Sequence, residues 1–127
     1  MNTFRLVVAG GRDFNNFFYL TAVLDKLLED KILTHNVVIV SGMARGADTL
    51  GERYAKMRRL DIDYHLADWD RYGKSAGYRR NEQMALSSDA SCVFWDGKSK
   101  GSAHMIDLTK KSNNALRVVM YQPKEVV

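Results

Sequence analysis

The chain has 127 residues, of which 46% are hydrophobic and 27% charged, with one proline, nine glycines and one cysteine. This composition predicts a single globular domain over residues 1–127 and excludes disordered, collagen-like and disulfide-stapled chains. The net charge of +4 is compatible with an anionic partner but does not demand nucleic acid. The lone Cys92 and the lack of a long apolar run predict a cytoplasmic protein with no membrane association.

Short apolar runs alternate with segments of helical periodicity along the chain. Continuous apolar runs such as 37–40 are typical of strands that are buried on both faces. In chain order, the pattern predicts a strand at 4–9, a helix at 17–28, a strand at 37–40, a helix at 46–59, a strand at 62–66, a polar loop at 68–77, a helix to about residue 88, a strand at 91–95, a helix at 101–111, a strand at 116–121 and a loose tail at 122–127.

Five strands with helices between them predict an α/β fold, a Rossmann-like three-layer sandwich. Its sheet would be mainly parallel, with helices on both faces and strand order 3-2-1-4-5 because crossovers are right-handed. Ligands bind such sheets beyond the carboxyl ends of the strands, at the switch point between the first and fourth strands. The loops that follow strands are therefore the expected places for function.

The first two of these loops are rich in glycine. Gly11, Arg12 and Asp13 follow the first strand, where Arg12 would hold a phosphate, although a tight turn with an exposed charge pair explains them equally well. The loop after the second strand opens directly into a helix, whose N-terminus attracts anions. Its caps and close packing offer a purely structural alternative; the candidate residues in this loop are Ser41, Gly42, Arg45, Gly46 and Asp48.

The remaining two loops add basic residues. The long aromatic segment 68–77 leads into Arg80 and Asn81, where an arginine near a helix start would hold a phosphate. The loop after the fourth strand forms a second glycine-rich cradle, or else a flexible turn with solubilising lysines; its candidates are Gly97, Lys98, Gly101 and Ser102. Eight of the 19 basic residues lie in these four loops or at the helix starts they open: Arg12, Arg45, Arg71, Lys74, Arg79, Arg80, Lys98 and Lys100.

The sequence gives no support for a metal site, a disulfide bond or the catalytic triad of a hydrolase. The three histidines lack metal-ligand spacing, so no metal and no cofactor are predicted. Ser41 lacks a nucleophile elbow, and Cys92 lies within a predicted strand as a small buried hydrophobe.

Together the motifs resemble small bacterial and phage proteins of the SLOG superfamily, nearest to the YspA/YpsA-related branch and the domain of unknown function numbered 2493. The similarity runs from about residue 4 to 121. It is carried by Gly10-Gly11-Arg12-Asp13-Phe14, Ser41-Gly42-x-Ala44-Arg45-Gly46-Ala47-Asp48, Asp68-Trp69-x-x-Tyr72-Gly73-Lys74-x-Ala76-Gly77, Arg80-Asn81-x-x-Met84 and Gly101-Ser102.

The resemblance implies a Rossmann-like domain that binds a nucleotide or nucleotide-derived ligand, as a sensor, sponge or regulator. It also implies two alternatives, a LOG-like phosphoribohydrolase acting on nucleoside monophosphates and a DprA-like protein that binds single-stranded DNA. The LOG enzymes carry a catalytic glutamate where this chain has Met105. Binding without efficient turnover is therefore expected; if a carboxylate replaces that glutamate, the candidates are Asp13, Asp48, Glu52 and Asp96.

Self-association is a further expectation. LOG-like relatives form dimers or larger assemblies, and the predicted first helix carries three large apolar residues in a row, Phe17, Phe18 and Tyr19. A sheet of this size cannot cover all three, and exposed apolar patches often mark interfaces. The sequence thus predicts a homodimer, with a small nucleotide-like molecule as the principal partner and single-stranded nucleic acid as the alternative one.

Overall fold

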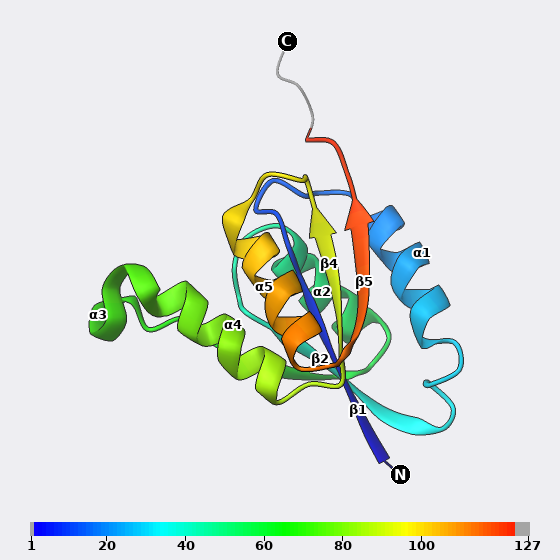
Figure 1. Ribbon diagram of the computed structural model, residues 1–127. Coiled ribbons are helices and arrows are strands. Elements are labelled where there is room, and N and C mark those ends of the chain that lie inside the picture. The colour runs from blue at the N-terminus through cyan, green and yellow to red at the C-terminus, as the bar shows by residue number, and fades with distance from the viewer. Residues whose placement is uncertain (1, 124–127) are drawn as a thin grey trace.

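The computed structural model describes residues 2–123 and confirms the predicted α/β fold. Five strands form one sheet in the order β3-β2-β1-β4-β5, and every neighbouring pair is parallel (Figure 1). The strands are β1 (Asn2–Gly10), β2 (His35–Ser41), β3 (Asp61–Tyr64), β4 (Ala90–Trp95) and β5 (Ala115–Met120).

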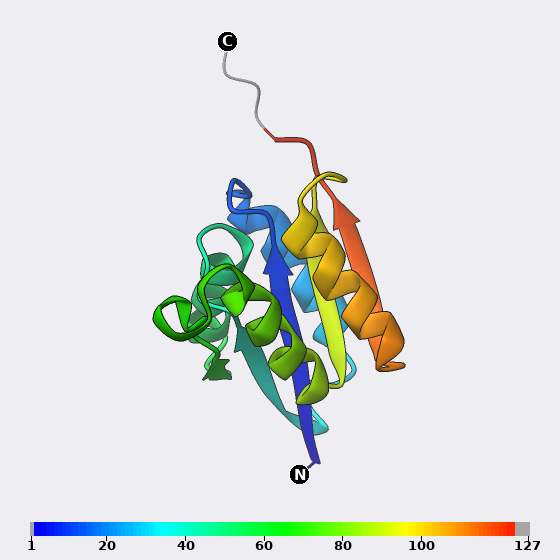
Figure 2. The same cartoon turned by 60° about the vertical axis from the view of Figure 1, so that its left-hand side comes forward.

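Helices cover both faces of the sheet, which gives three layers (Figure 2). They are α1 (Phe17–Leu28), α2 (Ala47–Met57), α3 (Trp69–Tyr72), the 3₁₀ turn η1 (Gly73–Ser75), α4 (Ala76–Leu86) and α5 (Lys100–Lys111).

Alternate residues of β1 enter two separate cores because successive side chains of a strand point to opposite faces. Leu6 and Val8 belong to the core beneath α1 and α2, whereas Val7 and Ala9 belong to the core beneath α4 and α5. All four are less than 10% exposed. This two-sided burial explains why the strand reads as a continuous apolar run.

The prediction of a loop at 68–77 is wrong, because most of this segment is helical. Asp68 caps α3 by accepting the N–H of Arg71 at 3.1 Å, and Gly73, with φ +56°, ends that helix. A four-residue helix shows no measurable apolar period, and the glycine suggested a break in structure. The other predicted elements are present with small shifts at their ends; residues 124–127 of the predicted tail lie outside the described residues.

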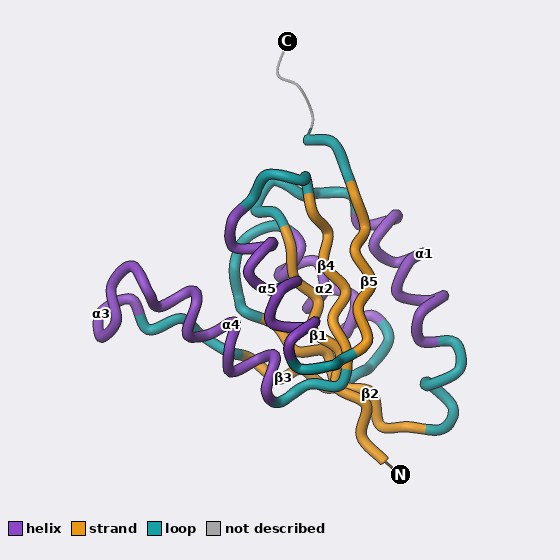
Figure 3. Tube along the Cα trace, viewed as in Figure 1, coloured by secondary structure: helices purple, strands orange, loops and turns teal. Residues whose placement is uncertain are grey.

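The segment α3-η1-α4 forms an arm that extends away from the body of the sheet (Figures 1 and 3). The C-terminal part of α4 anchors the arm, since Met84 and Ala85 are buried in the core beneath α5.

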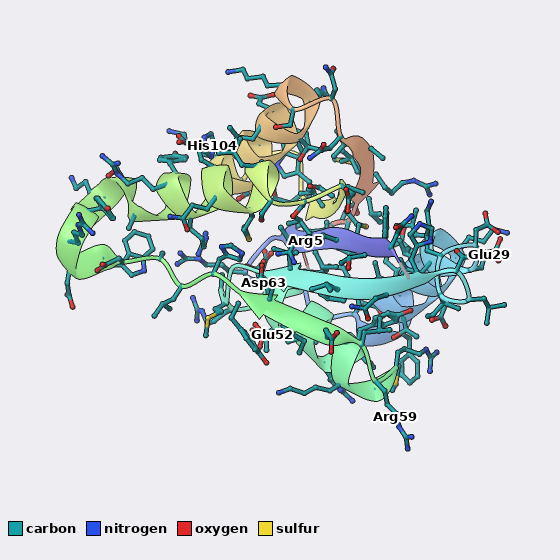
Figure 4. All side chains as sticks on the ribbon, turned by 90° about the horizontal axis from the view of Figure 1, so that it is seen from below. Arg5, Glu29, Glu52, Arg59, Asp63 and His104 are labelled. Carbon is teal, nitrogen blue, oxygen red and sulfur yellow. The ribbon has the colours of Figure 1, made fainter. Side chains whose placement is uncertain are left out.

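Next to the arm, Arg5 of β1 forms an ion pair with Asp63 of β3, and Figure 4 shows these two side chains near each other. His65 also contacts the Asp63 carboxylate, at 2.8 Å.

The helix α1 exposes two large side chains, those of Phe18 and Tyr19, and Tyr19 is 42% exposed. Phe18 is 89% exposed, whereas Phe17 is half-buried, with the Arg53 guanidinium 4.1 Å from the centre of its ring. Homodimer formation through this helix stays a prediction. Across residues 2–123, no helix is both long and apolar enough to cross a membrane.

Candidate functional site

A cleft of about 520 Å³ opens at the carboxyl ends of β1 and β4. Because the sheet order reverses between these two strands, the cleft occupies the switch point where open α/β sheets bind ligands. Figure 3 shows the loops that follow β1 and β4 gathered at this end of the molecule. The predicted site residues that line the cleft are Gly11, Arg12, Asp13, Asp48, Arg80, Asn81, Gly101 and Ser102.

The other predicted site residues lie outside this cleft. Gly42 and Arg45 line a smaller side pocket, and Lys98 lines a separate hollow beside Asp96 and Tyr121. Ser41 is only 1% exposed and donates its hydroxyl to Glu52 at 2.6 Å. The remaining two predicted residues, Gly46 and Gly97, form turns with positive φ, of +79° and +83°.

Gly46 joins the loops that follow β1 and β2. A Cβ atom at this position would overlap the backbone of Gly11 and Arg12, and its φ of +79° disfavours any other residue. The next N–H, that of Ala47, donates to the carbonyl of Gly11 at 3.2 Å. The first N–H of α2 is therefore already used by the protein itself.

Asp48 brings a carboxylate into the first turn of α2. It is 4% exposed and accepts the N–H of Ala44 at 3.3 Å. Burial raises the pKa of Asp48 to about 6, against the opposing influence of the Ala44 hydrogen bond and the Arg80 charge. When ionised, this carboxylate would repel an anion from the start of α2.

Arg80 of α4 also lines the cleft, where its guanidinium and the Asp48 carboxylate both border Gly42. Its Nη1 donates to the carbonyl of Gly42 at 2.9 Å, while its Nε is buried with no hydrogen-bond partner among the described residues. Burial lowers the pKa of Arg80, the charge of Asp48 opposes this shift, and the charge of Arg12 adds to it. An arginine held in this way, with donors to spare and a second arginine nearby, is suited to an anionic ligand.

The start of α5 is open to the cleft. Ser99 provides no side-chain cap, and the first turn contains no acidic residue. The first N–H groups of a helix have no acceptor within it, so those of Gly101 and Ser102 remain for a ligand. Just before the helix, Asp96 accepts the N–H groups of Ser99 and Lys98, at 2.8 and 2.9 Å, and these bonds lower its pKa.

Tyr121, which the sequence did not single out, supports the loop after β1 from beside the cleft and lines the separate hollow with Asp96 and Lys98. Its hydroxyl donates to Asp13, and its backbone N–H donates to the carbonyl of Trp95 at 3.1 Å. Burial, together with the hydrogen bond to Asp13, raises the pKa of this tyrosine. Tyr121 follows β5, so its place at the carboxyl edge of the sheet was the available signal.

The charges around the cleft are mixed. Arg12 and Arg80 face three carboxylates, those of Asp13, Asp48 and Asp96. Glu52, the fourth acidic candidate, does not line the cleft and instead accepts the Ser41 hydroxyl. Within residues 2–123, no three histidine, cysteine or acidic side chains gather as metal ligands would. The arrangement suits a ligand that has both anionic groups and hydroxyl donors.

Comparison with known proteins agrees with the resemblance seen in the sequence. The model of the YspA, cpYpsA-related SLOG family matches residues 4–72, which include the loops after β1 and β2. The chain is also 31% identical over 115 residues to the gene 61 protein of Mycobacterium phage D29, covering 85% of this chain and 90% of the phage protein. The chain therefore belongs to the YspA, cpYpsA-related SLOG family.

A solved structure is similar along most of the chain. It is a predicted subunit of a tRNA methyltransferase from Methanocaldococcus jannaschii, with a TM-score of 0.41 and 14% sequence identity. The similarity covers 94% of this chain and 68% of that one.

Proposed function

We propose that the protein binds a nucleotide or nucleotide-derived ligand in the cleft at the switch point, as a sensor, sponge or regulator. The observation that carries this proposal is the meeting of Arg12 and Arg80 with the uncapped start of α5 in one cavity of about 520 Å³. Two arginines and free helix N–H groups are the donors that phosphate binding requires.

The phosphate belongs at α5 and not at α2. At α2, Ala47 already donates to Gly11, and the Asp48 carboxylate lies in the first turn. At α5, the first turn holds Gly101 and Ser102 and no acid. The carboxylates of Asp13 and Asp48 are the natural acceptors for ribose hydroxyl groups.

A small ligand fits the charges better than single-stranded DNA. Strand-binding grooves are positive along their length, so that they neutralise successive phosphates. Here three carboxylates line the same cleft as two arginines. This mixture favours one short ligand with a phosphate at one side and hydroxyl groups at the other.

Hydrolysis of a nucleoside monophosphate is the second candidate, and Asp48 favours it. A carboxylate with a pKa of about 6 inside a cleft is suited to proton transfer near neutral pH. Met105, at the position of the LOG glutamate, is 1% exposed and lines the same cleft. A thioether cannot stabilise a ribosyl cation, so we propose that binding dominates and turnover is slow.

Thermal-shift screening tests the binding proposal. We expect at least one of the nucleoside monophosphates, ADP-ribose or the cyclic dinucleotides to raise the melting temperature in a dose-dependent way. The Arg80→Ala variant should lose this response, and Arg79→Ala, which changes the exposed neighbour stacked on Tyr72, should keep it. No shift with any of these compounds at millimolar concentration would contradict the proposal.

A chromatographic assay for free base tests the second candidate. AMP, GMP, CMP and UMP are incubated with the protein, and we expect no release above that of a buffer blank. Turnover at ordinary enzyme rates of about 1 per second or more, abolished by Asp48→Asn, would establish the hydrolase instead.

A further inference from the structure

A second pocket, of about 220 Å³, adjoins the cleft. The two share Arg12, Ala44 and Arg80 in their walls, so a molecule held at the arginines can reach into both. The side pocket lies beneath the start of the arm, where the chain passes from β3 into α3. Its other lining residues are Gly42, Met43, Arg45, Leu66, Ala67 and Trp69.

The side pocket differs from the cleft in chemistry. Its charged lining residues are all arginines, and no carboxylate contributes to its wall. Three of its apolar side chains are strongly solvent-exposed: Leu66 is 73% exposed, Trp69 50% and Met43 43%. An apolar wall edged by arginines is suited to a flat ring that is attached to a phosphate.

Trp69 lies close to Arg80, one of the two arginines that both pockets share. A Cβ atom built on Gly77 would lie 3.5 Å from Cη2 of the indole and 3.7 Å from Nη2 of Arg80, so both groups border the same point of α4. The Asp68 cap fixes the backbone at the start of α3, from which Trp69 extends. The indole is therefore placed beside the phosphate-binding group, with half of its surface available for stacking.

We propose that the side pocket is a second ring-binding subsite and that the ligand has two ends. A phosphate or pyrophosphate lies at Arg12 and Arg80, one nucleoside fills the cleft, and a second aromatic ring stacks on Trp69. This inference rests on the proposed function, because it assumes that the cleft binds a nucleotide. It adds the ligand class, a molecule in which phosphate joins two ring-bearing groups.

Isothermal titration with matched one-ended and two-ended probes tests the inference. The one-ended probes are AMP, GMP, CMP and UMP; the two-ended probes are ApA, GpG, CpC and UpU, joined by one phosphate, and the corresponding dinucleoside 5′,5′-diphosphates. We expect the tightest two-ended probe to bind about tenfold or more tightly than its monophosphate, the gain that stacking of one base provides. The two linkages separate a single phosphate from a pyrophosphate at the arginines.

Variants of Trp69 assign the gain to the side pocket. Trp69→Ala should bring the two-ended probe to within about threefold of the monophosphate, and Trp69→Phe should retain most of the gain because a ring remains. Tyr78→Ala is the matched control, since Tyr78 is a 43% exposed aromatic of the same arm that does not line the side pocket. Two-ended probes should also quench the fluorescence of Trp69, and that quenching should vanish in Trp69→Phe while binding persists.

The outcomes separate this inference from the function on which it rests. Equal affinity for one-ended and two-ended probes, unchanged by Trp69→Ala, would overturn the second subsite and leave nucleotide binding intact. An absence of binding by every probe would overturn the proposed function and the subsite together. Affinity that rises steadily with oligonucleotide length and falls steeply with salt would identify a strand-binding groove and overturn the two-ended small ligand.

Discussion

The loops after β2 and β4 look alike in sequence but differ in what they leave open. Each combines glycines and a serine with a helix start. At α2 the loop is filled by the protein itself, through the bond from Ala47 to Gly11 and the buried Asp48 carboxylate. At α5 the helix start faces the cleft with no side-chain cap from Ser99 and no acid in its first turn, while Asp96 accepts the N–H groups of Lys98 and Ser99 just before it. The same motif thus serves packing at one loop and leaves a helix start open to the cleft at the other.

The largest change in stability is expected in the closely packed loop before α2. Gly46→Ala places a side chain at a positive φ and against the backbone of the β1 loop, so we expect it to lower the free energy of unfolding by about 3 kcal/mol or more. Urea denaturation measures the change. Gly101→Ala is the matched control, because a Cβ there meets no atom within 4 Å. Equal stability of the two variants would contradict the inferred difference in packing between the loop at α2 and the start of α5.

Arg80→Ala tests the ligand side. We expect affinity for the best nucleotide found by screening to fall about ten- to hundredfold, the equivalent of ~1.5–3 kcal/mol for a charged hydrogen bond. Titration calorimetry measures the loss, and Arg79→Ala should bind like the unaltered protein. A loss confined to Arg79→Ala would mean that the ligand binds the outside of the arm.

Asp48 should make the free energy of unfolding dependent on pH. Its pKa in the folded protein, about 6, lies above the 3.8 of an exposed carboxyl, so folding favours the protonated form. That stabilisation is fully present below about pH 4 and is lost as the pH rises through 6, by roughly 3 kcal/mol. Urea denaturation of the unaltered protein and of Asp48→Asn across pH 4–7.5 should show this difference. Parallel curves for the two proteins would contradict the assignment.

Gly101→Asp converts the start of α5 into a copy of α2. The new carboxylate should weaken nucleotide binding about tenfold by repulsion, while leaving stability unchanged or raised by ~0.3–1 kcal/mol through its interaction with the helix dipole. Calorimetry and urea denaturation of the one variant report both quantities. Unchanged affinity would show that the phosphate does not lie at α5.

The sequence predicted the sheet order because buried parallel strands read as continuous apolar runs, as in 37–40, and because crossovers are right-handed. It could not distinguish the two loops. Whether a helix start is occupied depends on contacts between distant segments, such as those of Ala47 with Gly11 and of Arg80 with Gly42. Tyr121 was missed for the same reason, since its partner Asp13 lies 108 residues away in the chain.

Phosphate binding at the start of α5 can be tested most directly by amide chemical shifts. Nitrogen-15-labelled protein is titrated with AMP, GMP, CMP and UMP, and the backbone signals are followed by NMR. We predict that the largest shifts occur at the N–H groups of Gly101 and Ser102, with smaller ones at Ala47 and Asp48. If the largest shifts occur at the start of α2 and the signals of α5 do not move, phosphate does not bind at α5.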